Sequence, residues 1–197
     1  FLWEVCWQET MPLRLPPMSF ALGGEGLDPS LPISVNGALL QPGQSFMVDI
    51  GGVTSYGYMG DMSRVFSIGK LPEKAYVAHQ VCLDIQEAVV EKAKPGAVCE
   101  DLYNLAIDIV TKAGFADNFM GATQKAKFIG HGIGLEINEM PVLAPRMKQE
   151  LEPGMVFALE PKIVLPGIGP VGIENSWVVT AEGVEKLTLC KEEIVEL

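Results

Sequence analysis

Four carboxylates within apolar strand segments constrain this chain more than any other feature of its sequence. Asp49 lies in Met-Val-Asp-Ile, Glu160 in Ala-Leu-Glu-Pro and Glu174 in Val-Gly-Ile-Glu, and Asp61 lies within the segment that ends in Arg-Val-Phe-Ser-Ile. A carboxylate in a half-buried sheet is costly unless a cation, a shared proton or an arginine neutralises it. The fold must therefore bring a neutralising group to these positions.

The first two carboxylates are symmetric about a predicted turn. Residues 45–53 and 56–68 form two apolar runs that together predict a hairpin. Asp49 and Asp61 are equidistant in sequence from Ser55, which lies in the turn of this hairpin. We therefore expect them to lie opposite one another, with Cβ atoms about 4.5–5.5 Å apart if they share a face.

The other two carboxylates repeat this arrangement. Glu160 and Glu174 are equidistant from Gly167, within a Pro/Gly-rich turn. One facing pair is explained by a shared proton or by Arg64, but two pairs with the same symmetry favour divalent cations. Two such ions would change the net charge from −11 to −7. A two-metal site with ions about 3.5–4 Å apart can hold a nucleophilic hydroxide and polarise a carbonyl group.

The two histidines differ in their surroundings. His79 lies among apolar residues at helical spacing, which favours a packed or surface role without chemistry. His131 lies between Gly130 and Gly132, where the backbone can approach a ligand closely, so it is the candidate nitrogen ligand. A phosphate loop is excluded here because no helical pattern follows the glycines.

The order of expected elements is strands, helices, strands. Apolar spacing predicts a helix from Pro72 to Lys94, ended by Pro95-Gly96, and a second helix over 99–113, ended by Gly114. Residues 155–189 read as two or three strands rich in Val and Ile. The sequence therefore predicts an α+β fold, with helices packed against an antiparallel sheet.

Charge and cysteine content exclude several classes of protein. Asp and Glu number 25 against 14 Lys and Arg, which argues against binding nucleic acid or an anionic membrane surface. No apolar run is long enough to span a membrane. The four cysteines form no Cys-x-x-Cys pair, so we expect free thiols in the cytoplasm. Because the chain opens at Phe1 without a basic segment, we expect a longer or truncated N-terminus rather than a signal peptide.

Five motifs together resemble the metallopeptidase superfamily of creatinase, prolidase, aminopeptidase P and methionine aminopeptidase, family M24. They are Val48-Asp49-Ile50-Gly51, Asp61-Met62-Ser63-Arg64, Gly130-His131-Gly132-Ile133-Gly134, Leu159-Glu160-Pro161 and Gly172-Ile173-Glu174-Asn175. The segments Glu-Pro-Lys and Gly-Ile-Gly-Pro-Val-Gly-Ile-Glu-Asn are most similar to the Xaa-Pro peptidase branch. The resemblance implies the pita-bread fold, a curved antiparallel sheet with helices on its outer face and two pseudo-symmetric halves. We expect an N-terminal segment over 1–34 and the catalytic domain over 35–197.

The resemblance also implies a set of site residues. The implied metal ligands are Asp49, Asp61, His131, Glu160 and Glu174. In this reading a hydroxide bridges two ions, and Glu160 is also the general base. Of the remaining polar residues, Asn138 would orient the substrate carbonyl group. Glu139 would either contact the substrate or have a purely structural role. Arg64 would brace Asp61 or an adjacent strand.

Three departures from the family pattern concern the substrate side. Asn138 stands where these peptidases usually carry a histidine in His-Glu-x-Pro, and Val142 stands where prolidases often have an arginine. Residues 29–34 contain no histidine, although the family usually places one before the first aspartate. The metal centre is therefore better supported than the peptide pocket.

The predicted function is hydrolysis of the N-terminal or Xaa-Pro bond of short peptides by a dinuclear metal centre. Mn²⁺ or Co²⁺ is expected, with Fe²⁺ or Zn²⁺ as alternatives. One alternative function is a creatinase-like reaction on a non-peptide small molecule, and another is a non-catalytic peptide-binding module. The partners expected are a small peptide and a second copy of the chain in a homodimer.

Overall fold

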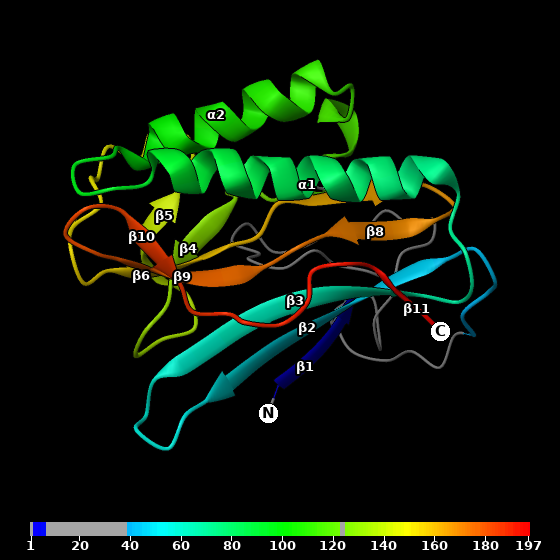
Figure 1. The fold of residues 1–197 in the computed structure, drawn as a ribbon, viewed down its shortest axis with the longest axis horizontal. Coiled ribbons are helices and arrows are strands. Elements are labelled where there is room, and N and C mark those ends of the chain that lie inside the picture. Colours follow the sequence, from blue (N-terminus) through cyan, green and yellow to red (C-terminus); the bar gives the residue numbers. More distant parts are fainter. Residues whose placement is uncertain (1, 7–38, 123–124) are drawn as a thin grey trace.

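The computed structural model describes residues 2–6, 39–122 and 125–197, with the backbone alone for 2–6 (Figure 1). These residues form three sheets, ordered β1-β2-β3-β11, β10-β9-β6-β4-β5 and β7-β8. The strands are β1 (Leu2–Cys6), β2 (Ser45–Val53), β3 (Met59–Ser67), β4 (Gly130–Gly132), β5 (Glu139–Leu143), β6 (Val156–Leu159), β7 (Lys162–Leu165), β8 (Gly169–Gly172), β9 (Asn175–Val179), β10 (Val184–Lys186) and β11 (Val195–Glu196). All paired strands are antiparallel except β11, which runs parallel to β3.

Two helices cover one side of the strands. Helix α1 (Glu73–Lys92) packs on β7 and β8, and α2 (Cys99–Lys112) packs on α1 and β5. A short 3₁₀ turn, η1 (Ala116–Asn118), follows them. Figure 1 shows both helices on one side of β8 and the β2–β3 hairpin on the other. The α+β class and both predicted helices are confirmed. The proposed boundary at residue 34 lies outside the described residues.

The buried side of each helix follows from its sequence spacing. In α1 the buried apolar residues recur every three or four positions, at Ala75, Ala78, Val81, Cys82, Ile85 and Val89. They join strand residues such as Phe157 and Ile163 in one core.

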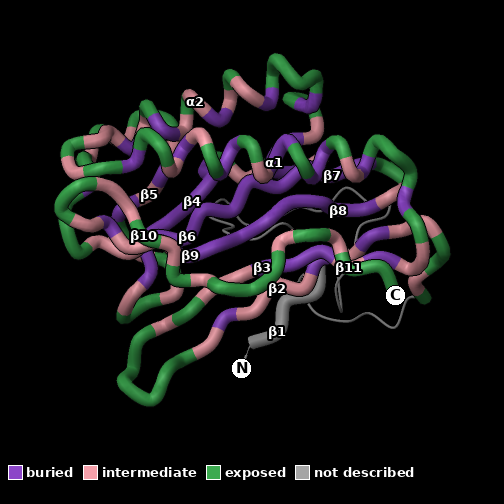
Figure 2. Tube along the Cα trace, viewed as in Figure 1, coloured by how far each residue is buried: buried purple, intermediate pink, exposed green. Residues whose placement is uncertain are grey.

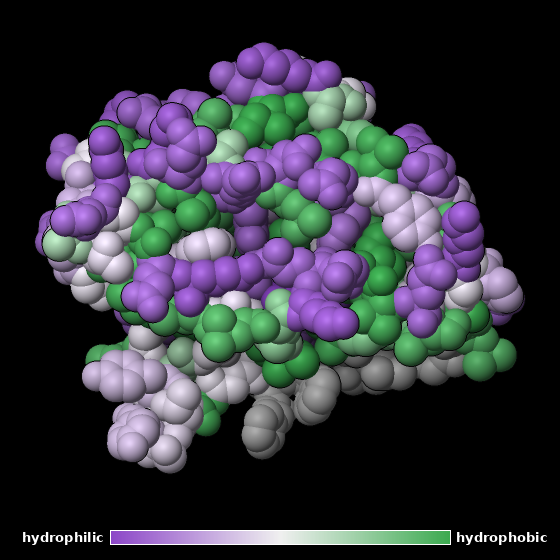
Figure 3. All heavy atoms as spheres, viewed as in Figure 1, coloured by the Kyte–Doolittle hydropathy of each residue, from purple (hydrophilic) through white to green (hydrophobic). Residues whose placement is uncertain are grey.

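Strands β7 and β8 are buried along their whole length, whereas the tip of the β2–β3 hairpin is exposed (Figure 2). Hydrophilic side chains gather over the helices in the space-filling view (Figure 3). No helix in the described ranges has the length and hydropathy of a membrane span.

The predicted hairpin over 45–68 forms, but its carboxylates do not lie directly opposite one another. Asp49 pairs with Ser63, and Asp61 pairs with Gly51. The prediction that Asp49 and Asp61 lie directly opposite one another is therefore wrong, because the pairing register is shifted by two residues. The two side chains share a face as diagonal neighbours, a relationship that separates residues by about 7–8 Å.

The turn of this hairpin explains the offset. The amide of Thr54 donates to the carbonyl of Tyr58 at 2.8 Å, which encloses residues 55–57. Gly57 has a φ of +86°, the left-handed conformation that such a loop requires. The hairpin is centred on Tyr56 rather than on Ser55. This one-residue shift of the centre moves the pairing register by two.

The second hairpin has the predicted symmetry. Strand β7 pairs with β8, and β6 pairs with β9 in the same register, so that Glu160 and Glu174 lie opposite one another in the break between the two ladders. Gly172 ends β8 with a φ of +151°. A Cβ atom there would lie 2.5 Å from the carbonyl oxygen of Pro161, so only glycine allows this close crossing.

Candidate metal centre

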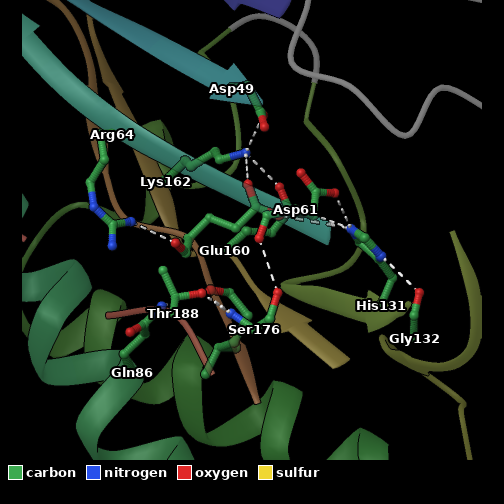
Figure 4. Close-up of polar contacts among 12 residues, drawn as sticks. Asp49, Asp61, Arg64, Gln86, His131, Gly132, Glu160, Lys162, Ser176 and Thr188 are labelled. Carbon is green, nitrogen blue, oxygen red and sulfur yellow. Dashed lines mark hydrogen bonds and ion pairs between the residues drawn. The ribbon is translucent and has the colours of Figure 1, made fainter. Parts of the chain in front are cut away.

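Three predicted ligands from different parts of the chain converge. Asp61 comes from β3, His131 from β4, and Glu174 from the junction between β8 and β9. Each offers a ligand atom, and these atoms all lie within 4.8 Å of one another. The side chains of His131 and Glu174 are buried, and that of Asp61 is nearly so. Figure 4 shows His131 directed toward the carboxylates, across the face of the β2–β3 hairpin.

Hydrogen bonds to backbone carbonyls hold these segments together. The amide of Glu174 donates to the carbonyl of Ser63 at 3.4 Å, and the Ser176 hydroxyl donates to the carbonyl of Asp61 at 3.0 Å. The amide of Glu160 donates to the carbonyl of Ile129, next to β4, at 2.8 Å. The hairpin that carries Asp61 is thus joined to the segment that carries Glu174.

The imidazole of His131 is oriented by its own strand. Its Nδ1 lies 3.0 Å from the carbonyl oxygen of Gly132. Because a carbonyl oxygen only accepts, Nδ1 carries the proton and Nε2 of the neutral ring keeps its lone pair. Nε2 faces three carboxylate oxygens, 3.3 Å from Glu160, 3.8 Å from Asp61 and 4.0 Å from Glu174. This is the tautomer that a metal-binding histidine needs.

A buried lysine that was not predicted as a site residue lies on the other side of the carboxylates. The Nζ of Lys162 lies 2.6 Å from Glu160, 3.1 Å from Asp49 and 3.5 Å from Glu174 (Figure 4). Its side chain is 4% exposed. The structure therefore divides the five predicted ligands: Asp49 faces the lysine, Asp61 and His131 face the other side, and the two glutamates face both.

The lysine and histidine determine the charge state of Glu160. Burial acts to raise the pKa of the Glu160 carboxyl group, but the Lys162 ammonium and His131 outweigh it and lower that pKa to about 2. Burial likewise acts to lower the pKa of Lys162, and the surrounding carboxylates hold it well above its usual value. Burial would also lower the pKa of His131, but Glu160 raises it. Glu160 and Lys162 are thus an ionised pair.

Asp61 and Glu174 have no cation as close as the ammonium beside Glu160. Burial, followed by the charges of Asp49 and Glu160, raises the pKa of Asp61 to about 7. Burial also raises the pKa of Glu174 well above its usual value, in spite of Lys162. One ammonium group therefore does not neutralise the cluster, and a further cation would displace protons from it.

The donor set on the His131 side fits a divalent metal ion. It combines two carboxylates with an imidazole nitrogen, a mixed oxygen and nitrogen set that Mn²⁺, Co²⁺, Fe²⁺ and Zn²⁺ accept. The carboxylate oxygens on the opposite side already accept hydrogen bonds from the Lys162 ammonium. The ligand atoms on the His131 side are therefore available to a metal ion. Those on the opposite side are engaged by the Lys162 ammonium.

Arg64 lies behind the centre rather than within it. It donates to the backbone carbonyls of Ser63, Glu174, Cys190 and Lys191 and to Oδ1 of Asn175. The structure records no contact between the Arg64 guanidinium and the Asp61 carboxylate. Arg64 is expected to brace either Asp61 or an adjacent strand, and its contacts with Glu174 and Asn175 lie at the start of β9.

The predicted substrate residues lie where the chain enters β5. Asn138 is exposed in the turn before β5, and the Glu139 carboxylate accepts from the amide of Glu136 at 3.0 Å. Neither residue has a recorded hydrogen bond to the carboxylates of the centre, so their assignment to substrate stays a prediction. The histidine-free segment 29–34 lies outside the described residues. His79 is buried in α1, and its Nε2 lies 2.7 Å from the carbonyl oxygen of Glu192.

The sequence did contain a signal for Lys162. It lies two residues after Glu160 in an extended segment, and residues at this spacing point to the same face. It also stands in an apolar run, between Ala158-Leu159 and Ile163-Val164-Leu165. A lysine is almost never fully buried without a partner, so the apolar run around it indicated an ion pair.

Comparison with known proteins agrees with this geometry. The model of metallopeptidase family M24 matches residues 16–181. The chain belongs to family M24. A curated M24 relative, the Xaa-Pro dipeptidase of Lactobacillus helveticus, is 35% identical over 166 residues, which are 84% of this chain and 43% of the relative.

Solved M24 structures confirm the pita-bread fold. The dipeptidase PepE of Mycobacterium ulcerans is 31% identical, with a TM-score of 0.75 over 90% of this chain and 46% of that one. The X-Pro aminopeptidase of Thermotoga maritima is 30% identical, with a TM-score of 0.72 over 80% of this chain and 43% of that one. The chain spans less than half the length of the M24 proteins that it matches here.

Proposed function

We propose that the protein is a divalent-metal-dependent peptidase that hydrolyses the Xaa-Pro bond of short peptides. The convergence of Asp61, His131 and Glu174, with Glu160 beside them, carries this proposal. Membership of family M24 and the Xaa-Pro dipeptidase name of its relatives support the substrate class.

The residues present fit a metal-dependent hydrolysis. Asp61, His131 and Glu174 would hold the ion, with Glu160 in reach of the same position. A bound divalent ion lowers the pKa of water and polarises a carbonyl group. The two-ion centre implied by the family resemblance stays a prediction, as do the metal identity, the cytoplasmic location and the homodimer.

The side chains have distinct roles in this proposal. The carboxylate of Glu160 is ionised and hydrogen-bonded on one oxygen to Lys162, and its other oxygen lies on the His131 side, where it would accept the proton of the attacking water. His131 supplies Nε2 because Nδ1 is engaged by Gly132. Asn138 would donate a hydrogen bond to the substrate carbonyl, since an amide cannot exchange protons near neutral pH.

A peptide panel tests the proposal directly. The purified protein is stripped with a chelator and reloaded with Mn²⁺ or Co²⁺, and release of the N-terminal residue is measured for Ala-Pro, Met-Pro, Ala-Ala and Arg-Pro-Pro. We expect hydrolysis of the proline dipeptides, little of Ala-Ala, and none without metal. Cleavage of Arg-Pro-Pro alone would place the protein with aminopeptidases instead of dipeptidases.

The same panel separates the alternatives. Metal binding without hydrolysis of any peptide would contradict the peptidase proposal and favour a non-peptide substrate. Tight binding of the peptides without metal or turnover would favour a peptide-binding module.

A further inference from the structure

Two carboxylates bridge the centre in a way that defines two cation positions. Glu160 turns Oε1 to His131 Nε2 and Oε2 to Lys162 Nζ, at 3.3 and 2.6 Å. Glu174 does the same, at 4.0 and 3.5 Å. Bridging carboxylates of this kind hold two cations in a dinuclear site. Here one of the two positions is next to Asp61 and His131, and the other contains the lysine ammonium.

The ammonium of Lys162 is fully engaged at its position. It has three protons to donate, and oxygens of Asp49, Glu160 and Glu174 lie around it at 3.1, 2.6 and 3.5 Å. Asp49 lies close to Lys162 and is absent from the group of atoms that converge with His131. A metal ion at this position would need the same oxygens and would lie against the ammonium.

The backbone around Lys162 fixes this placement. Its amide donates to the sulfur of Met120, and its carbonyl accepts from the amide of Met120 at 2.8 Å. Gly172 lies opposite it on β8. A Cβ on Gly172 would lie 3.2 Å from Cγ of Lys162, so the missing side chain there leaves room for the lysine stem. The lysine is therefore built into the sheet rather than folded in from the surface.

Charge balance leads to the same count. When fully ionised, the four carboxylates carry four negative charges, and the Lys162 ammonium balances one of them. One divalent ion brings the cluster, with His131 neutral, to a single negative charge. A second ion would make it positive and would be repelled by the ammonium at short range.

We propose that the centre binds one divalent ion, held by Asp61, His131 and the two glutamates, and that the Lys162 ammonium replaces the second ion. Asp49 is then a partner of the lysine and not a metal ligand. This inference rests on the proposed metal dependence and differs from the two-ion centre implied by the resemblance. The metal count distinguishes the two.

The decisive experiment measures metal stoichiometry in solution. The metal-stripped protein is equilibrated with Mn²⁺, desalted and analysed for manganese per chain, and the end point is checked by titrating Co²⁺ absorbance. We expect one ion per chain. In Lys162→Ala the second position is vacated and we expect two. Lys186→Ala removes a lysine paired with Glu192 outside the centre, and this control stays at one.

A second pair of variants tests the inference independently of Lys162. Asp61→Asn removes a ligand and should raise the Kd for Mn²⁺ by about 10-fold or more, whereas Asp49→Asn should change it less. Circular dichroism confirms that each variant is folded. Equal losses in the two variants would overturn the assignment of Asp49 to the lysine.

The remaining outcomes are also decisive. Two ions in the wild-type protein would overturn the inference and leave the metallopeptidase function standing. One ion in folded Lys162→Ala would show that the lysine does not replace an ion. The absence of any bound metal would overturn both the inference and the proposed function.

Discussion

Glu160 is one of the two glutamates that face both sides of the centre. One of its oxygens faces His131 and the other accepts a hydrogen bond from Lys162, and these neighbours keep it ionised. Gln at this position retains the shape but loses the charge that accepts a proton. The chemical role of Glu160 can therefore be separated from its packing.

We expect Glu160→Gln to lower kcat by about 10²-fold or more, the usual contribution of a general base. Hydrolysis of Ala-Pro by the metal-loaded protein measures this loss. Glu182→Gln changes an exposed carboxylate in the turn before β10 and serves as the matched control, with unchanged kcat. Retained turnover in a folded Glu160→Gln variant would remove Glu160 from the proton transfer.

His79 illustrates a buried titratable group away from the centre. Burial lowers its pKa, against the carbonyl and charge of Glu192, and Arg64 lowers it further. Its Nδ1 is buried without a recorded hydrogen-bond partner. Protonation would therefore place a charge on a ring that the fold holds neutral.

The pH dependence of stability follows from this shift. The pKa of His79 is lower in the folded state than its unfolded value of about 6.5, so the unfolded state binds more protons near that pH. The free energy of unfolding therefore falls as the pH drops through and below about 6.5. We expect His79→Gln to lose less unfolding free energy than the wild type between pH 8 and pH 5.5, measured by urea denaturation. The comparison cancels the opposite contributions of Asp61 and Glu174, whose raised pKa values are common to both proteins. Equal losses would exclude His79 as an acid-sensitive group.

At the scale of elements, β4 depends on close backbone contact. It pairs with β5 on one side and β6 on the other, and the register with β5 shifts between His131 and Gly132. A Cβ on Gly132 would lie 2.2 Å from the carbonyl oxygen of Met140. The strand that carries the histidine can approach both neighbours only because glycines flank it.

We therefore expect Gly132→Ala to lower the unfolding free energy by about 1–3 kcal/mol, the usual cost of overpacking, and to weaken metal binding by displacing His131. Thermal unfolding and a Mn²⁺ titration measure the two effects. At Gly183 a Cβ would meet nothing within 4 Å, so Gly183→Ala is the matched control. A Gly132→Ala protein as stable as this control would contradict the close contact.

At the scale of the whole molecule, Arg64 joins segments that are distant in sequence. From β3 it reaches the carbonyl of Glu174 at 2.7 Å and that of Lys191 at 2.6 Å, and its side chain is almost completely buried. It thus connects the first hairpin with the second and with the C-terminal segment. Without the guanidinium several buried carbonyls would lack a donor.

Arg64→Met should lower the unfolding free energy by at least about 3 kcal/mol, since each unpaired buried carbonyl costs about 1–3 kcal/mol. Urea denaturation measures the loss. Arg146→Met changes an exposed arginine and should leave stability within about 0.5 kcal/mol of the wild type. A small loss in Arg64→Met would mean that water replaces the guanidinium.

Metal should stabilise the same assembly, because its ligands come from β3, β4 and the β8–β9 junction. Binding to the folded state alone adds about 2.7 kcal/mol at a free ion concentration of 100 times Kd. We expect chelation to lower Tm and Mn²⁺ to restore it, whereas Mn²⁺ should leave the Tm of Asp61→Asn nearly unchanged. A Tm that does not respond to metal in the wild type would argue against a resident ion.

The sequence by itself determined the helices, the two hairpins and the candidate ligands. Apolar spacing and the Pro95-Gly96 stop place α1 correctly because helix periodicity is a local property of the backbone. The symmetry of Glu160 and Glu174 also holds, since a tight turn fixes the register of strands that it joins.

Only the tertiary structure decided what surrounds each carboxylate. The turn of the first hairpin is centred one residue later than the midpoint of Asp49 and Asp61, which sets these two residues diagonally. Lys162 meets Asp49 across 113 positions of sequence, and Arg64 meets Glu174 across 110. Such contacts depend on how whole sheets pack, and no local periodicity encodes them. The charge of the centre, and with it the number of metal ions it can hold, is therefore a property of the fold.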